Sequence, residues 1–349
     1  MTHFRFRLGA LALTAAVLAF ATTSVAAEDP AAFYRSHTVK FIAGGGPGGG
    51  YDTYARMIAP YLGHALGTTV IVENQPGAGG LVALNRLYVS DPDGLALVIM
   101  NGGAAVMSQL FGLPTVKYDL AKVGYIGTAS SSPWLVLVQP EAPYKALTDL
   151  AKKNGVVRWP ATGPIDGLSD GAAMVCEAFR IDCHIVMGYK SSNESALAVK
   201  RGEMDAIYVS DTSANHYHSS GTVRAIATLS PERSQFFPEL PTVYESMKLT
   251  DEQKWWLDMR SSVDALGRLM MTSPGVPPER LAYLQTAMKR ALNDPALLAE
   301  ATKSQRYVKY SDPEATKKHA LGLISGMSTE QKVRAKDVVM SKYFGEGRK

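Results

Sequence analysis

Two glycine-rich loops, each set between an apolar run and a helical stretch, constrain the fold most strongly. The first, residues 44–50 (GGGPGGG), follows the apolar run 38–42, and the second, residues 76–80 (PGAGG), follows the run 69–74. Helical patterns start directly after each loop, and a turn at 91–94 leads into a third strand-like run at 95–100. Strand, loop and helix repeated in this way predict a parallel α/β sheet.

The α/β pattern restarts after residue 130. Strand-like runs at 123–128 and 134–139 flank the Ser-Ser-Ser-Pro break at 130–133, where we place a crossing between domains. Further strands are expected at 156–159, 184–187, 206–209 and 224–229, and C-terminal helices at 278–293, 295–304 and 313–341. We therefore predict two α/β domains joined by a two-strand hinge. Domain 1 begins at 28–129, domain 2 spans 130–250, and residues 251–349 return to domain 1 with its C-terminal helices.

The N-terminus has the features of an export signal. Arg5 and Arg7 precede an apolar segment at 8–21, which ends in the small residues of 24–27. This pattern predicts a secretory signal peptide at 1–27 and a periplasmic protein. The apolar segment is shorter than the roughly 20 residues of a transmembrane helix. An uncleaved signal that anchors the chain is the alternative.

Charge and cysteine content exclude several classes of function. The formal charge of +4 falls to +2 without the signal, which holds two basic and no acidic residues, and no basic stripe interleaved with aromatics predicts nucleic-acid binding. Cys176 and Cys183 are the only cysteines. In an oxidising compartment they are either bridged or buried as free thiols, and the spacing leaves both open. No metal site is predicted, since His184 is the only histidine near them, and the pair His216 and His218 is more typical of a solvated turn.

The first glycine loop also matches the dinucleotide fingerprint G-x-G-x-x-G, with Glu73 where a ribose-binding acid would lie. Three features oppose that interpretation. A loop so rich in glycine matches the template in several registers, Pro47 lacks the N–H that a pyrophosphate needs, and export places the chain away from nicotinamide cofactors. We therefore predict no cofactor and keep an exported NAD-dependent dehydrogenase as the alternative.

The two loops together predict an anion site. Both lie at the carboxyl ends of neighbouring parallel strands and at the start of helices, where free N–H groups and the helix dipole favour negative charge. Glycine allows the backbone to approach a ligand closely because it has no Cβ. We interpret the pair as a cradle for a carboxylate, with two ordinary βα turns as the alternative.

Several motifs resemble the Bug-type receptors of tripartite tricarboxylate transporters. They are PGGGYD at 47–52, VIVENQPGAGG at 70–80, DPDG at 91–94, GYK at 188–190, RGEMD at 201–205, RAIA at 224–227 and PTV at 241–243. The resemblance covers most of the mature chain. It implies a periplasmic-binding-protein-like Venus flytrap that captures a small organic carboxylate and delivers it to a membrane permease.

The resemblance also implies which residues bind the ligand. In the first domain they are Pro47, Gly48, Gly49, Tyr51, Asp52, Gly77, Ala78, Gly79 and Gly80, and in the second they are Thr162, Gly163 and Ser169, with Ser131, Asp211 and Thr212. Two departures stand out. The loop 159–170 is stiffer than the family's usual loop and carries two acids, and the stretch 254–260 replaces a short strand entry. Ligand specificity is therefore expected to differ.

Enzyme signatures are weak. Tyr244 and Lys248 match the Y-x-x-x-K pair of short-chain dehydrogenases but lie outside the strand-and-helix setting that this chemistry needs, and no G-x-S-x-G elbow occurs. We expect a monomeric binding protein and no catalysis. A receptor that senses its carboxylate for a signalling partner is a further alternative, and the sequence does not indicate which carboxylate is bound.

Overall fold

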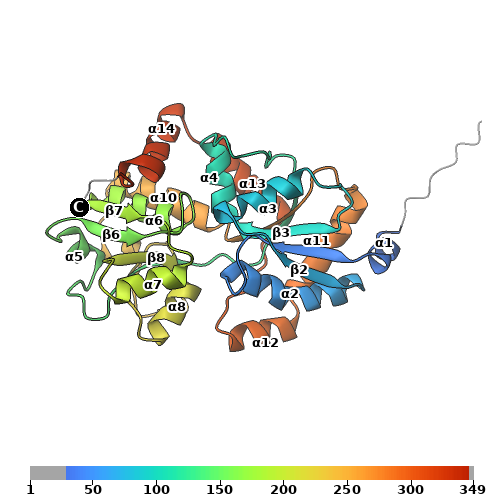
Figure 1. Cartoon of the computed structure of the whole chain (residues 1–349), viewed down its shortest axis with the longest axis horizontal. Coiled ribbons are helices and arrows are strands. Elements are labelled where there is room, and N and C mark those ends of the chain that lie inside the picture. The colour runs from blue at the N-terminus through green and yellow to red at the C-terminus, as the bar shows by residue number, and fades with distance from the viewer. Residues whose placement is uncertain (1–28, 346–349) are drawn as a thin grey trace, which may run out of the picture.

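The first domain is built on a five-stranded sheet in a computed structural model that describes residues 29–345 (Figure 1). The predicted signal peptide at 1–27 lies outside the described residues. The strand order is β2 (Val70–Asn74), β1 (Val39–Ala43), β3 (Ala96–Asn101), β10 (Arg268–Thr272) and β4 (Gly124–Thr128). β1 runs parallel to β2 and β3, as expected, whereas β10 is antiparallel to both of its neighbours. The late strand β10 therefore completes the sheet from the far end of the sequence.

Side chains that alternate along the strands supply a core on each face of this sheet. Phe41 and Leu97 pack with α1 (Pro30–Ser36), α2 (Gly50–Leu66), α11 (Pro278–Leu292) and α12 (Pro295–Lys303). Ile42 and Val98 pack on the other face, with α3 (Leu81–Tyr88), α4 (Gly102–Leu110) and α13 (Pro313–Ser325). Strands covered on both faces must be apolar throughout, which explains the continuous apolar runs in the sequence.

The second domain contains two hydrogen-bonded groups of strands. β5 (Trp134–Val138) lies between β8 (Ala206–Ser210) and β9 (Arg224–Thr228), antiparallel to both, and β6 (Val157–Pro160) pairs in parallel with β7 (Cys183–Val186). The Asp205 N–H donates to the Arg158 carbonyl at 2.9 Å and links the two groups. Around them lie α5 (Leu147–Ala151), α6 (Leu168–Phe179), α7 (Ser192–Lys200), α8 (Asp211–Ser219) and α9 (Val243–Ser246).

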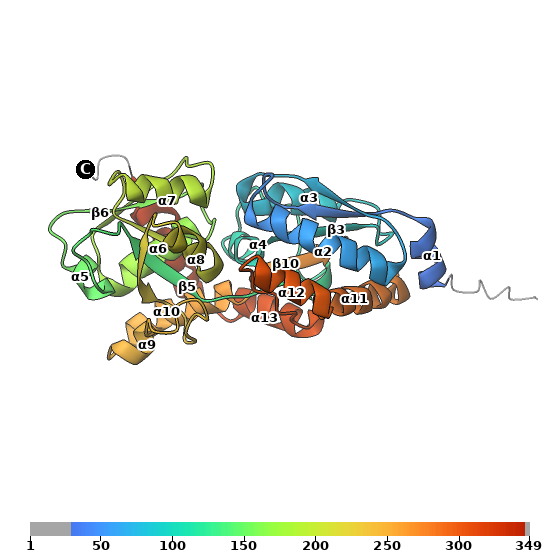
Figure 2. The same ribbon diagram turned by 90° about the horizontal axis from the view of Figure 1, so that it is seen from below.

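Two segments that precede the C-terminal helices connect the domains. The chain passes to the second domain through residues 129–133 and returns through 265–267, after α10 (Asp251–Asp264), whereas the sequence pattern predicts the return at 251. α10 packs against α6 and α4, and so contacts both domains (Figure 2). The stretch 254–260, noted in the sequence as a departure from the family pattern, lies within α10, and its Trp256 is fully buried.

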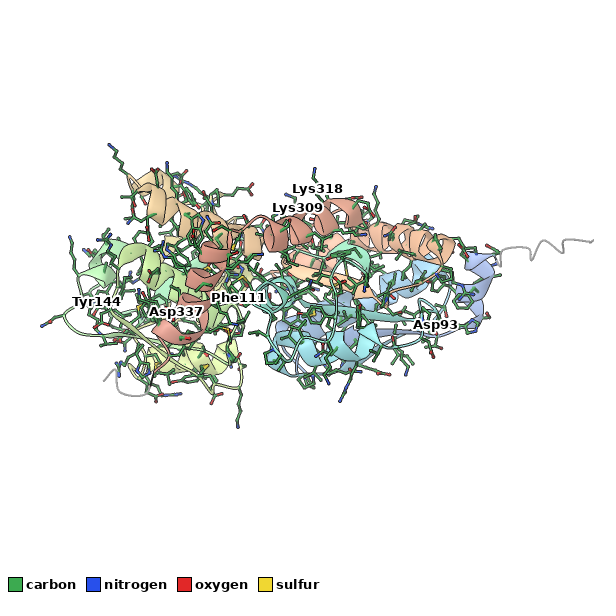
Figure 3. All side chains as sticks on the ribbon, turned by 90° about the horizontal axis from the view of Figure 1, so that it is seen from above. Asp93, Phe111, Tyr144, Lys309, Lys318 and Asp337 are labelled. Carbon is green, nitrogen blue, oxygen red and sulfur yellow. A yellow bond between two sulfur atoms is a disulfide. The ribbon has the colours of Figure 1, made fainter. Side chains whose placement is uncertain are left out.

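A third crossing was not expected. The single helix predicted at 313–341 is interrupted, because α13 ends at Ser325 and Ser328 caps a new helix, α14 (Thr329–Asp337), which continues into η2 (Val338–Lys342). η2 packs on α6 of the second domain, whereas α11, α12 and α13 pack on the first. The Lys336 ammonium group donates to the Phe111 carbonyl at 2.9 Å, which ties α14 to the end of α4. Figure 3 labels Phe111 and, at the end of α14, Asp337. The C-terminal segment α14–η2 therefore contacts both domains.

A disulfide joins Cys176 of α6 to Cys183 of β7, with their Cα atoms 6.2 Å apart. Of the two states that the spacing left open, the bridged one is present. Within residues 29–345, no helix has both the length and the apolar character needed to cross a membrane.

Candidate ligand-binding site

A cavity of about 150 Å³ lies between the two domains. Both domains, α10 and the crossings at 129–133 and 265–267 supply its walls, through Gly50, Tyr51, Asn101, Ser130, Ser132, Trp134, Asp166, Leu168, Ser192, Val209, Ser210, Ser213, Val263, Asp264, Gly267 and Arg268. Its volume is below the about 300–1,000 Å³ typical of sites for drug-sized ligands. The cavity therefore suits a ligand of few atoms.

Five helices begin at this cavity. α2 starts at Gly50 and α4 is capped by Asn101 in the first domain, and α6, α7 and α8 start at Leu168, Ser192 and Asp211 in the second. The N-terminus of a helix carries unpaired N–H groups and a partial positive charge. Their convergence from both domains favours an anion in the cavity.

Arg268, the first residue of β10, places a full positive charge at the cavity wall. Its guanidinium carbon lies 3.9 Å from the centroid of the Tyr54 ring, and its Nη1 donates to the Ser130 hydroxyl at 2.8 Å. Its Nε is buried without a hydrogen-bond partner, and no acid within residues 29–345 forms an ion pair with it. Sequence reasoning missed Arg268, although a charged residue that opens the apolar run 268–272 is a usable signal.

Most of the first glycine loop lies outside the lining of the cavity. Pro47, Gly48 and Gly49 do not line the cavity, whereas Tyr51, at the start of α2, does. Burial raises the pKa of Tyr51 to about 12, against the opposing charge of Arg268, and so keeps its phenol neutral. A neutral phenol can donate a hydrogen bond to an anion.

Asp52 binds its own loop. One carboxylate oxygen accepts from the Gly48 N–H at 2.8 Å, and the other accepts from the Asn74 amide at 2.9 Å and lies 2.9 Å from Arg56 Nε. Burial favours the neutral acid, but these hydrogen bonds and the Arg56 charge lower the pKa of Asp52 overall. The Asp52 carboxylate therefore fixes the glycine loop and the first turn of α2.

The second glycine loop meets the second domain. Gly77, Gly79 and Gly80 all have positive φ, and so does Ala78. A β-carbon on Gly79 would lie 3.2 Å from the Ala104 β-carbon and 3.5 Å from the Ile165 carbonyl oxygen across the domain boundary. None of these four residues lines the cavity, and Gly79 lies against Ile165 of the second domain instead.

Asp166 engages the expected second-domain residues. The Thr162 and Gly163 N–H groups donate to one of its oxygens at 2.7 and 3.1 Å, and the Ser169 N–H and hydroxyl donate to the other at 2.7 and 2.8 Å. Of these four residues only Asp166 lines the cavity. The loop's donors are thus directed at a carboxylate of the chain itself.

Ser131, Asp211 and Thr212 lie outside the cavity. Asp211 is buried, accepts from the Ser234 hydroxyl at 3.1 Å, and lines a separate cavity of about 110 Å³ with Ser131. Burial raises the pKa of Asp211, although hydrogen bonds from Ser132 and Ser234 oppose the rise. The neighbouring residues Ser130, Ser132, Ser210 and Ser213 line the candidate site in their place.

A buried ionic cluster supports the cavity beside α10. Arg260 lies 2.8 Å from Asp170 and 2.5 Å from Asp264, and the Tyr208 hydroxyl donates to Asp264 at 2.8 Å. Burial raises the pKa of Asp264 to about 6 against the charge of Arg260. The Tyr208 ring stacks on Trp134 with centroids 5.1 Å apart. The cluster therefore fixes the aromatic wall of the cavity.

Comparisons with known proteins agree with this architecture. A family model described as the tripartite tricarboxylate transporter family receptor matches residues 54–322. Protein BugT of Bordetella pertussis is 27% identical over 232 residues, which cover 64% of this chain and 70% of BugT.

Two solved structures share the fold. The periplasmic binding protein BugD superposes with a TM-score of 0.69 at 22% identity, over 86% of this chain and 97% of BugD. MatC from Rhodopseudomonas palustris, solved with bound malate, gives a TM-score of 0.65 at 22% identity, over 86% of this chain and 98% of MatC. The two-domain clamp is thus the fold of periplasmic binding proteins.

Proposed function

This chain belongs to the receptor family of the tripartite tricarboxylate transporters, and we propose that it captures a small organic carboxylate between its two domains and delivers it to a membrane permease. Export to the periplasm, as the sequence of residues 1–27 predicts, would place it where such a receptor acts. MatC, which shares the fold, is solved with malate, and this supports an organic acid as the class of ligand.

Arg268 carries this proposal. It is a cation at the wall of the interdomain cavity, with a buried Nε that lacks a partner and with no ion pair in the described part of the chain. A buried guanidinium nitrogen without a hydrogen-bond partner is costly, and a ligand carboxylate would provide one. Tyr51 and the N-terminus of α2, next to Arg268, would supply further donors to the same carboxylate.

Capture would depend on closure of the domains. A ligand shifts the clamp toward its closed form only if it binds that form more tightly than the open one. Since the walls of the cavity come from both domains, contacts to Arg268 on one side and to Trp134 on the other exist together only when the clamp is closed. The closed form would then be the one that the permease recognises.

Binding without chemistry fits the first glycine loop better than the dehydrogenase alternative does. The Gly48 N–H, which a pyrophosphate would need, already donates to Asp52 at 2.8 Å. Because Pro47 has no N–H, the middle of the loop has little left to offer a dinucleotide.

The test is ligand binding by the wild type and by two arginine variants. Calorimetric titration with a panel of mono-, di- and tricarboxylates, beside NAD, should show binding of an acid and none of NAD. Arg268→Gln should weaken that binding about 100-fold, or about 3 kcal/mol, because the ligand's charge loses its partner. Stabilisation by NAD with no response to any acid, or unchanged affinity in Arg268→Gln, would overturn the proposal.

Arg306→Gln is the matched control. Arg306 is also half-buried, and its guanidinium carbon lies 5.7 Å from the centroid of the same Tyr54 ring, but it does not line the cavity. Its removal should leave the affinity within a few-fold of the wild type. An equal loss in both variants would indicate a general effect of charge and not a direct contact by Arg268.

A further inference from the structure

The second-domain loop before α6 is arranged to bind a carboxylate. It offers the N–H groups of Thr162, Gly163 and Ser169, and Ser169 lies in the first turn of α6, where the helix dipole adds to the attraction. The neighbouring Leu168 lines the cavity. This loop therefore borders the cavity from the second domain, where an anionic group of the ligand would approach it.

The Asp166 carboxylate already accepts hydrogen bonds from these N–H groups. Its two oxygens accept the three N–H groups at 2.7–3.1 Å, and the hydroxyls of Thr162 and Ser169 donate to them as well. A carboxylate has about four lone-pair positions, and five donors saturate them. A second carboxylate on the ligand would therefore have no free donors in this loop, and the Asp166 carboxylate would fill the position next to them.

The charges around the cavity lead to the same conclusion. Asp166 and Asp264 both line the cavity, and the positive charge of Arg260 is shared between Asp170 and Asp264. Arg268 is the one cation of the lining without an ion pair in the described residues. The cavity thus offers one positive charge to one carboxylate, and a second would face like charges.

Apolar side chains also line the cavity. They belong to Trp134, Leu168, Val209 and Val263, alongside several serines, and the Trp134 ring stacks on Tyr208. A β-carbon on Gly167 would lie 2.6 Å from the Trp134 ring, so the loop that carries Asp166 also packs against this indole. The indole and the aliphatic side chains favour an uncharged group with apolar surface.

We propose that Asp166 determines specificity by standing in for the second carboxylate of a ligand, so that this receptor selects a small monocarboxylate with an apolar remainder. The inference rests on the proposed carboxylate-binding function and narrows it to one class of acid. It also gives a role to an acid by which the loop 159–170 departs from the family's usual pattern.

Calorimetric titration of the exported protein with matched pairs of acids tests this inference. The pairs are butanoate and succinate, lactate and malate, and benzoate and phthalate, each differing by one carboxylate. We expect the monocarboxylate of any pair that binds to bind at least about 10-fold more tightly than its partner. If the dicarboxylate binds equally or better, the inference is wrong and the proposed function stands. If no carboxylate binds, the proposed function itself fails.

Variants at Asp166 test the mechanism. Asp166→Ala leaves the N–H groups of the loop without an acceptor. It should reduce the preference for the monocarboxylate at least about 10-fold, because the second carboxylate of the dicarboxylate gains a binding site. Asp166→Asn removes the charge but keeps one acceptor oxygen, and should give an intermediate preference with little disturbance of the loop. An unchanged preference in both folded variants would overturn the inference.

Asp149→Ala is the matched control. Asp149 is likewise a carboxylate that accepts backbone N–H groups before a second-domain helix, from Lys145 at 2.9 Å and Ala146 at 3.1 Å, but it does not line the cavity. This variant has the same change in net charge and likewise loses a carboxylate that accepts backbone N–H groups at the start of a helix. It should keep the wild-type preference for the monocarboxylate.

Discussion

Gly267 lies against the backbone of Ser130 so closely that a β-carbon on Gly267 would stand 1.9 Å from the Ser130 carbonyl oxygen. The two residues belong to the crossings at 129–133 and 265–267. The same carbonyl accepts the Arg268 N–H at 2.9 Å, and the Ser130 hydroxyl accepts from the Arg268 side chain. Contact between the crossings therefore sets the position of the cavity's unpaired cation.

Gly267→Ala should loosen this hinge. The added methyl group cannot fit without moving one crossing, and φ at Gly267 is +45°, which disfavours any residue with a β-carbon. We expect a loss of roughly 2–3 kcal/mol in the free energy of unfolding, with weaker ligand binding as Arg268 is displaced. Denaturation with guanidinium chloride and calorimetric titration measure the two effects.

Gly322→Ala provides the comparison for that variant. Gly322 lies in α13, where a β-carbon would meet no atom within 4 Å, so alanine should raise the stability by about 0.5–1 kcal/mol. If Gly267→Ala is as stable as the wild type, the crossings are not tightly coupled.

Local sequence patterns predicted the strands, glycine loops and helix starts of the first domain well. Both glycine loops lie between a strand and the start of a helix, because apolar runs and glycines report local backbone requirements directly. The antiparallel insertion of β10 was not predictable in the same way. Its partners β3 and β4 are far away in sequence, and pairing at that distance leaves no periodic signal.

The candidate site was harder to predict for the same reason. The resemblance selected residues of the glycine loops, of which Tyr51 lines the cavity, while Arg268 reaches it from a strand more than 200 residues later. Asp166 was visible as an extra acid in a loop. Its engagement with Thr162, Gly163 and Ser169 depends on the exact turn of that loop, which sequence alone does not specify.

Asp264 should make stability depend on pH between about 4 and 6. Its pKa is raised to about 6 in the folded protein, mainly by burial, from an ordinary 3.8. A raised carboxyl pKa means that the folded state binds the proton more tightly, so this contribution to stability is full below pH 4 and is lost as the pH rises through 6. The loss amounts to at most about 3 kcal/mol.

The measurement compares the wild type with Asp264→Asn, whose amide does not titrate in this range. The free energy of unfolding of the wild type, relative to the variant, should decrease from pH 4 to pH 7. Asp52 and Asp205 have lowered pKa values and act in the opposite direction, but they are common to both proteins and cancel in the difference. A difference that stays constant or increases would show that the pKa of Asp264 is not raised in the folded protein.

Gly79→Val should prevent the clamp from closing. Valine at this position would place its methyl groups against Ala104 and against the Ile165 carbonyl of the other domain, where even a β-carbon lies at 3.2 and 3.5 Å. We expect ligand affinity to fall at least about 10-fold, because the closed state loses about 1.4 kcal/mol or more relative to the open state. Calorimetric titration measures the affinity, and small-angle scattering with saturating ligand reports whether the domains still close.

Gly202→Val separates this effect from backbone strain. Gly202 has φ of +74°, close to the +66° of Gly79, but a β-carbon there would meet no atom within 4 Å. Both variants should lose a similar stability from the left-handed backbone, roughly 1–2 kcal/mol. Only Gly79→Val should lose affinity, since only Gly79 contacts the opposite domain; equal affinities in the two variants would mean that the second glycine loop takes no part in closure.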